Sequence, residues 1–88
     1  MIWKEINKQK YASDTGIEIY SISKEKIGIE IVGKVFEVYC EYLGDGKFAL
    51  DRSSITLNGA TVEFDSFKSE VGEISEGLDA LLGNFTWD

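Results

Sequence analysis

Carboxylates are the side chains best placed to do chemistry in this 88-residue sequence, which has 16 Asp and Glu, a single cysteine and no histidine. With no histidine and only one cysteine, Ser-His-Asp and Cys-His arrangements and soft metal sites are excluded. A pair of carboxylates acts as acid and base only where an apolar cleft raises one pKa, and a chain this short has little room for such a cleft. We therefore expect a non-enzymatic protein that uses no cofactor and no metal.

Two short patterns partly match ligand-binding loops, but each fails at a required position. Residues 28–34 fit the first seven positions of a phosphate-binding loop, whereas Val35 stands where that loop needs a Ser or Thr for magnesium. Asp45 and Asp51 are spaced like calcium ligands, but Lys47 occupies a ligand position and no closing Glu follows. Turns between strands explain both segments better.

The single thiol and the lack of long apolar runs indicate in which cellular compartment the protein works. Cys40 has no intramolecular disulfide partner, and we expect it to be a buried, inert thiol. Residues 1–5 lack the apolar core of a signal peptide, and no apolar run approaches the roughly 20 residues of a membrane helix. These observations favour a cytoplasmic protein with no membrane partner.

The charge of the chain is acidic and unevenly distributed. The formal net charge is −7, and residues 45–88 carry nine acids against three bases, with no basic residue after Lys68. Proteins that bind a nucleic-acid backbone neutralise phosphates with Lys and Arg, so we expect no direct nucleic-acid partner. The acid excess favours a basic protein partner, steered mainly by the C-terminal half.

Turn signals predict the elements that position these groups. Gly33-Lys34 predicts a two-residue hairpin loop with glycine at positive φ. This loop sets Ile31 opposite Phe36 on an apolar face and Glu30 opposite Glu37 on the other face. The glutamate pair is mildly unfavourable because like charges lie directly across the strands.

Two further turns predict more hairpins. Gly44-Asp45-Gly46 is typical of a three-residue loop, and it sets Cys40 opposite Leu50. Asn58-Gly59 is the strongest short hairpin signal, and it sets Thr56 opposite Thr61.

For the strand expected at residues 17–22, the sequence leaves open which side chains point into the core. A two-residue loop after it would bury Tyr20 and Ile22, whereas a three-residue loop would bury Ile17 and Ile19.

A change of period predicts a C-terminal helix. Apolar residues recur at spacings of three and four, which places them on one stripe of a helix: Phe67, Val71, Ile74, Leu78, Leu81 and Leu82. Asp65 or Ser66 can cap its start, and Gly83 is well placed to close its end. Gly72 and Gly77 weaken the helix, so packing on a sheet must hold it.

Together these elements predict one α+β domain over residues 1–88. Its architecture is an antiparallel β-meander of five or six strands with one C-terminal amphipathic helix packed on one face. Residues 1–11 form either a strand or a short helix, with a strand favoured, and residues 84–88 can fold back onto the core. The second face of the sheet stays open.

Two surfaces are candidates for partner binding. Acidic residues at three-residue steps run along the helix: Glu70, Glu73, Glu76 and Asp79. On the open sheet face, apolar and aromatic anchors share a surface with acids: Val32, Val35, Tyr39 and Leu43 with Glu30, Glu37 and Glu41. The competing explanations are a merely solvated helix face, and a sheet face covered by residues 1–11 or by a sister subunit.

The leading hypothesis is an acidic protein-binding domain, an inhibitor or immunity-type protein such as a phage or mobile element encodes. Its carboxylates would stand in for phosphates and occlude a basic surface of a partner protein, such as a nucleic-acid-binding site. The alternative is a structural or assembly subunit that forms a homodimer through the open sheet face or an edge strand. A small-molecule site ranks last, because one layer of strands under one helix encloses little volume.

Overall fold

The computed structural model describes residues 3–67 and 69–88, without the side chains of Ser66 and Phe67. The described strands are β1 (Trp3–Asn7), β2 (Lys10–Ser13), β3 (Glu18–Ser23), β4 (Lys26–Ile31), β5 (Lys34–Gly44), β6 (Lys47–Leu50), β7 (Thr56–Leu57), β8 (Ala60–Thr61) and β9 (Asn84–Trp87). The helical elements are η1 (Arg52–Ser54), η2 (Phe64–Phe67) and α1 (Val71–Leu82), of which η1 and η2 are 3₁₀ turns.

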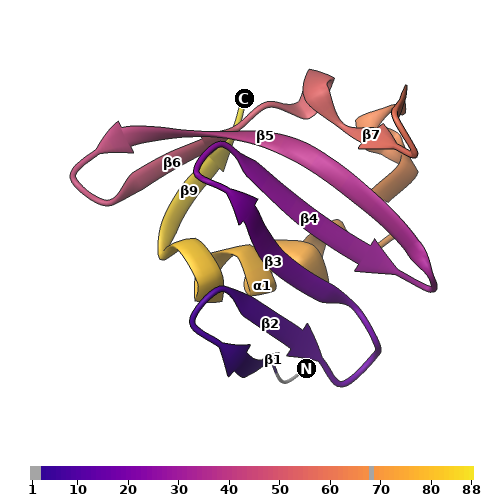
Figure 1. Cartoon of the computed structure of the whole chain (residues 1–88), viewed down its shortest axis with the longest axis horizontal. Helices are drawn as coiled ribbons and strands as arrows, with labels where there is room; N and C mark the ends of the chain where they lie inside the picture. The colour runs from indigo at the N-terminus through magenta and orange to yellow at the C-terminus, as the bar shows by residue number, and fades with distance from the viewer. Residues whose placement is uncertain (1–2, 68) are drawn as a thin grey trace.

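The strands form one sheet in the order β1-β2-β3-β4-β5-β6-β9 (Figure 1), and off this path β7 pairs with β5 and β8 pairs with β7. The α+β class and the mostly antiparallel sheet under one C-terminal helix are confirmed. The described sheet has nine strands rather than five or six, because residues 3–13 form a hairpin of their own and the C-terminal tail adds β9. Residues 3–11 therefore extend the sheet and do not cover its open face.

The C-terminal tail pairs in parallel with β6, with Phe48 opposite Phe85 and Leu50 opposite Trp87. Parallel neighbours need a long crossover connection, and the segment that ends in α1 supplies it. The helix contacts β1, β2 and β3 on one side and β9 on the other, so the sheet curls around it (Figure 1). The core lies between sheet and helix, and its fully buried side chains include Ile19, Ile29, Leu50, Ile74 and Leu78.

The first hairpin differs from the predicted register. Its turn is Val32-Gly33, with φ of 48° and 78°, as a type I′ turn requires. Ile31 therefore lies opposite Lys34, and Phe36 lies opposite Ile29. The predicted pairing of Ile31 with Phe36 is wrong by two residues, but a two-residue slip keeps every side chain on its face.

The same slip separates the two glutamates that were expected to face each other. Glu30 lies opposite Val35, and Glu37 lies opposite Gly28. The unfavourable like-charge pair across β4 and β5 therefore does not form. Across β3 and β4, however, Glu30 lies opposite Glu18.

The other predicted pairings are confirmed. Cys40 lies opposite Leu50, and Thr56 lies opposite Thr61. Ile17 and Ile19 are the buried pair in and beside β3. The loop that follows has two residues rather than the three expected for this arrangement, because a register shift between Ser21 and Ser23 adds the extra residue.

The helix begins later than expected. Asp65 and Ser66 belong to the separate 3₁₀ turn η2, so neither caps α1; Glu70 is the residue at its N-cap, without a side-chain capping bond. The predicted end is confirmed, because Gly83 follows the helix at φ 85°. The predicted contribution of the Phe67 side chain to the apolar stripe lies outside the described residues. No helix in the described chain is long and apolar enough to cross a membrane.

Candidate functional site

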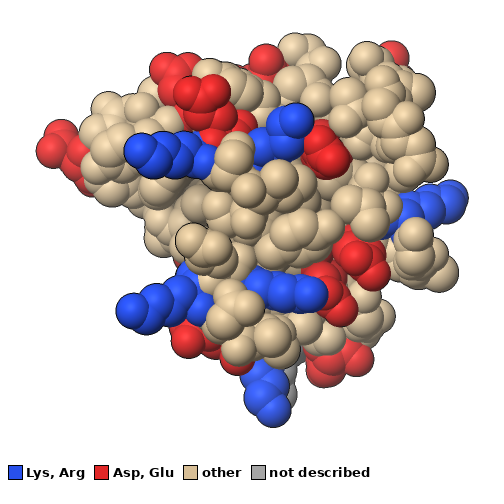
Figure 2. Space-filling view, viewed as in Figure 1, with Lys and Arg blue, Asp and Glu red and all other residues tan. Residues whose placement is uncertain are grey.

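On the open face of the sheet, two of the acids form ion pairs with lysines. Lys10 Nζ lies 2.7 Å from Glu18 Oε1, and Lys26 Nζ lies 3.2 Å from Glu37 Oε1. The hydrogen bond and charge of Glu18 raise the pKa of Lys10. Blue and red side chains are interspersed over this face in Figure 2. Glu37 is therefore not available as an unpaired carboxylate for a partner.

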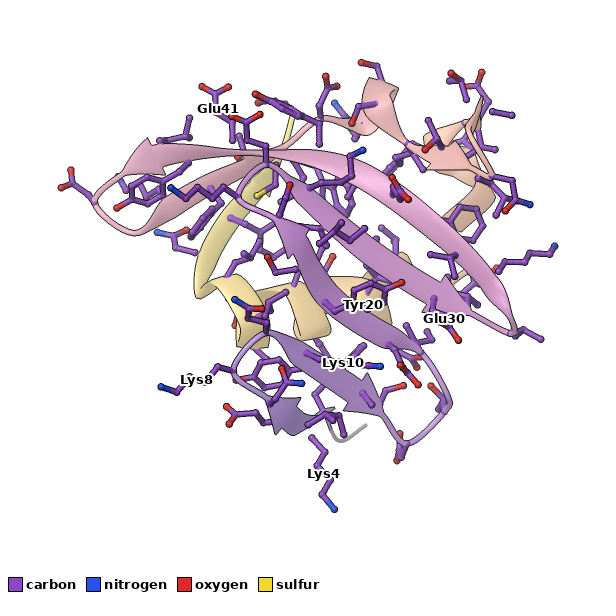
Figure 3. The ribbon with its side chains drawn as sticks, in the orientation of Figure 1. Lys4, Lys8, Lys10, Tyr20, Glu30 and Glu41 are labelled. Atoms are coloured by element: carbon purple, nitrogen blue, oxygen red, sulfur yellow. The ribbon has the colours of Figure 1, made fainter. Side chains whose placement is uncertain are left out.

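The remaining sheet residues proposed from the sequence do not form one patch. Glu30 and Glu41 lie at opposite ends of the face (Figure 3). Tyr39, with 40% of its surface exposed, lies between Glu37 and Glu41 along β5. Val32 is not on the sheet face at all, because it occupies the β4–β5 turn. The open face is thus a mixed surface rather than a continuous acidic one.

The acids of α1 divide into two pairs. Glu76 and Asp79 are exposed, and the ion pairs found among the described residues do not involve them. Asp79 lies toward the helix C-terminus, where the macrodipole disfavours an acid and no basic residue occupies the last turn. Glu70 and Glu73 are half-buried at the N-terminal end.

Glu70 and Glu73 line a small cavity that three segments build together. The cavity measures about 210 Å³, and we call its described lining residues the acidic notch: Thr15, Gly16, Ile17, Ile31, Val32, Glu70 and Glu73. They come from the β2–β3 turn, the β4–β5 turn and the start of α1. Among them the two glutamates are the charged residues, and the rest of the wall is small or apolar.

Local hydrogen bonds fix the walls of the acidic notch. Ser13 Oγ accepts hydrogen bonds from the backbone N–H groups of Thr15 and Ile17, which shapes the β2–β3 turn. Thr15 Oγ1 in turn donates a hydrogen bond to Glu73 Oε2. The carboxylate of Glu73 is therefore held in place from outside its own helix.

Val32 adds an unusual apolar edge to the acidic notch. Its φ of 48° lies in the left-handed region, which a β-branched residue rarely adopts. Its side chain is 90% exposed. A strained, exposed valine at a turn tip contributes nothing to the core, and such outliers cluster at binding sites.

Two titratable groups outside the notch have shifted pKa values, and each has a structural cause. Cys40 is 2% exposed, and burial raises the pKa of its thiol, so it is protonated at neutral pH. Hydrogen bonds from Ser53 lower the pKa of Asp51, which caps η1. Within the described part of the chain, no group of three or more acidic or cysteine side chains could hold a metal ion.

Sequence reasoning named Glu70, Glu73 and Val32 but put Val32 on the sheet face, and it missed the other walls of the notch. Thr15 and Glu73 are 58 positions apart, and nothing in the local sequence connects them. Val32 could have been placed at the turn by treating Val32-Gly33 as the two-residue loop, since type I′ turns favour glycine at a central position.

Comparisons of this chain with models of known protein families, with curated proteins and with solved structures find no match.

Proposed function

We propose that the chain is a non-enzymatic binding domain that occludes a basic surface of a partner protein, and that the acidic notch receives a Lys or Arg side chain of that partner. The observation that carries this proposal is the composition of the notch. Its charged lining residues, Glu70 and Glu73, are both acidic. They lie beside Val32, an exposed apolar side chain on a strained turn.

The dimensions and chemistry of the notch suit a long basic side chain. Carboxylates form short, charge-assisted hydrogen bonds with guanidinium and ammonium groups. The apolar stem of an Arg or Lys packs on aliphatic walls while its charged head reaches polar groups, and Ile17 and Ile31 supply such walls. Glu73 is already oriented by Thr15, so binding costs less side-chain entropy at that carboxylate.

A competing explanation is that Glu70 and Glu73 only stabilise the helix. Acids in a first helical turn do so by about 0.3 to 1 kcal/mol each. That effect accounts for the charges, but it accounts neither for the cavity beside them nor for the strain at Val32.

The rest of the chain fits the same proposal. The net charge of −7 would accelerate encounter with a basic partner and make it salt-dependent. Glu76 and Asp79 continue the acidic surface along α1. Because Cys40 is an unpaired thiol, we place this binding in a reducing cytoplasm.

The experiment is affinity capture from lysate of the source cells with three immobilised proteins: wild type, E70Q/E73Q and the control E25Q/E63Q. Both double variants remove two carboxylates, but Glu25 and Glu63 are exposed residues outside the acidic notch. We expect wild type and control to retain a basic protein that elutes as salt rises. The affinity of the E70Q/E73Q variant for this protein should be at least about tenfold lower, as expected for loss of a hydrogen bond to a charged group. Equal retention by all three proteins would refute a role for the notch.

A second candidate is a homodimer, favoured by one feature of β5. The first β4 residue, Lys26, lies opposite Tyr39, so residues 41–44 of β5 extend beyond β4. Leu43 in this extension is 55% exposed, and a second copy could add a strand here. Sedimentation decides between the two: a salt-insensitive dimer favours the assembly subunit, and a monomer favours the occluding domain.

A further inference from the structure

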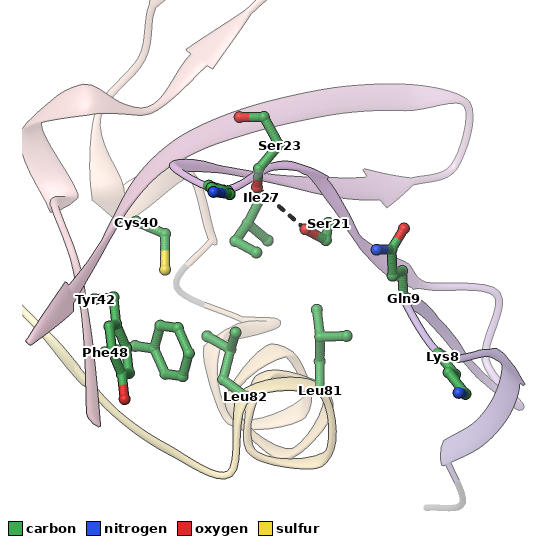
Figure 4. A pocket seen from close by; sticks show the side chains of 11 residues that line it. Lys8, Gln9, Ser21, Ser23, Ile27, Cys40, Tyr42, Phe48, Leu81 and Leu82 are labelled. Carbon is green, nitrogen blue, oxygen red and sulfur yellow. Dashed lines mark hydrogen bonds between the residues drawn. The ribbon is translucent and has the colours of Figure 1, made fainter. Parts of the chain in front are cut away.

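A second, larger cavity lies between the sheet and the C-terminal half of α1. It measures about 400 Å³, within the range of small-molecule sites. Figure 4 shows its apolar side chains converging from the sheet and the helix. The apolar part of the lining consists mainly of Ile27, Cys40, Phe48, Leu81 and Leu82.

The cavity exists because a small residue stands where the core would otherwise be filled. Ser21 lies opposite Ile27 on β3 and β4 and lines the cavity. Two positions earlier, on the same face, Ile19 is fully buried. The register of β3 shifts directly after Ser21, so the strand ends without placing another large side chain inside.

The charged residues at this cavity are basic, although the protein as a whole carries a net charge of −7. Among the described lining residues only Lys8 and Lys24 are charged. They belong to the β1–β2 and β3–β4 turns, which approach the cavity from two sides. The positions are exposed, and their long side chains can meet an anionic group at the mouth.

This cavity and the acidic notch lie at opposite ends of the sheet. In an antiparallel meander, successive turns alternate between the two ends. The β2–β3 and β4–β5 turns line the notch, whereas the β1–β2 and β3–β4 turns line the cavity. The helix points its N-terminal turn to the first site and Leu81 and Leu82 to the second. The two sites therefore have opposite charge and separate walls.

We propose that this cavity binds an amphipathic monocarboxylate, with an apolar chain against the side chains of the core and the carboxylate between Lys8 and Lys24. The apolar lining provides the hydrophobic driving force. The two lysines add selectivity for a single anionic group over a neutral or cationic one. The cavity of about 400 Å³ is the largest departure from our expectation that one layer of strands under one helix offers little volume for a small molecule, and the proposal rests on that volume.

The test compares three probes with the same ten-carbon chain: decanoate, decanol and decyltrimethylammonium. Methyl NMR spectra of Leu81, Leu82 and Ile27 report entry into the cavity, and titration at low salt gives each affinity. We expect decanoate to shift these methyl signals and to bind about fivefold more tightly than decanol, as expected for two exposed charge contacts. Decyltrimethylammonium should bind most weakly.

Two variants and a control complete the test. K8Q/K24Q should reduce decanoate affinity to that of decanol, whereas K4Q/K34Q, which removes two exposed lysines outside the cavity, should change it little. S21L should fill the cavity and weaken both probes, with circular dichroism confirming the fold. Decanoate that leaves the methyl signals unmoved below its micelle concentration would overturn the proposal. So would decanoate affinity that K8Q/K24Q leaves unchanged.

Discussion

The ring of Tyr20 lies over Gly28, its partner across β3 and β4 on the open face of the sheet. A Cβ on Gly28 would come within 2.5 Å of Tyr20 Cε2, so glycine is what permits this contact. On its other side, the ring lies 5.6 Å from Lys10 Nζ. Partial desolvation of the phenol, assisted by the charge of Glu30, raises the pKa of Tyr20, and we attribute part of that desolvation to the packing over Gly28.

The substitution Gly28→Ala should displace this ring and lower the pKa of Tyr20 toward its ordinary value of about 10. The ring end is on an exposed face and can move, so we expect the fold to survive. Alkaline titration of tyrosinate absorbance measures the pKa, and Tyr20→Phe identifies which of the transitions belongs to Tyr20. An unchanged pKa in Gly28→Ala would show that the ring over Gly28 is not the cause.

The two helix glycines should respond in opposite ways to alanine. A Cβ on Gly77 would lie 2.6 Å from the Trp3 ring and 2.7 Å from Ile19 Cδ1, whereas a Cβ on Gly72 would meet nothing within 4 Å. We expect Gly72→Ala to raise the free energy of unfolding by about 0.5 to 1 kcal/mol. Gly77→Ala should lower it by roughly 1 to 3 kcal/mol because the core is overpacked. Urea denaturation measures both, and a stabilised Gly77→Ala would contradict the close packing of Trp3 on the helix.

Replacing Val32 should stabilise the fold and weaken binding of the basic partner. Asn favours positive φ and precedes Gly33 as type I′ turns prefer, so Val32→Asn should raise the free energy of unfolding by about 1 kcal/mol. The same variant removes the exposed apolar edge of the acidic notch, so we expect weaker capture of the basic partner. Thermal denaturation measures the first effect and the capture experiment the second. A variant that gains stability and keeps full binding would remove Val32 from the proposed site.

The buried thiol should make stability fall at alkaline pH. Burial raises the folded pKa of Cys40, whereas the unfolded thiol ionises near its ordinary pKa of about 8.5. The stabilising contribution of the protonated thiol is therefore fully present below the unfolded pKa. It is lost as pH rises from there through the folded pKa. Urea denaturation from neutral pH to about pH 9.5 should show a steeper loss in wild type than in Cys40→Ala. Parallel losses of stability in the two proteins would mean that folding does not shift the pKa of the Cys40 thiol.

Features that depend on alternation and turn chemistry were predictable from the sequence. Cys40 opposite Leu50 follows from the loop at residues 44–46. In the first hairpin, however, Gly33 can occupy either central position of a two-residue loop. Sequence alone did not reveal that the strained residue Val32 takes the other position.

Features that depend on the curl of the sheet could not be predicted. The parallel pairing of β9 with β6 requires knowing where α1 delivers the chain. The contact between Thr15 and Glu73 joins a turn to a helix across most of the sequence. The larger cavity depends on Ser21 facing inward, and the facing of that strand was ambiguous.

The central claim is that the acidic notch accepts a basic side chain, and amide NMR titration with a short arginine peptide tests it most directly. The peptides are acetyl-Ala-Arg-Ala-amide and its glutamine counterpart. We predict saturable shifts for the arginine peptide at residues 14–17, 31–33 and 70–74 in wild type and in E25Q/E63Q, and none there in E70Q/E73Q. Shifts spread evenly over the open sheet face, or equal shifts with the glutamine peptide, would contradict the claim.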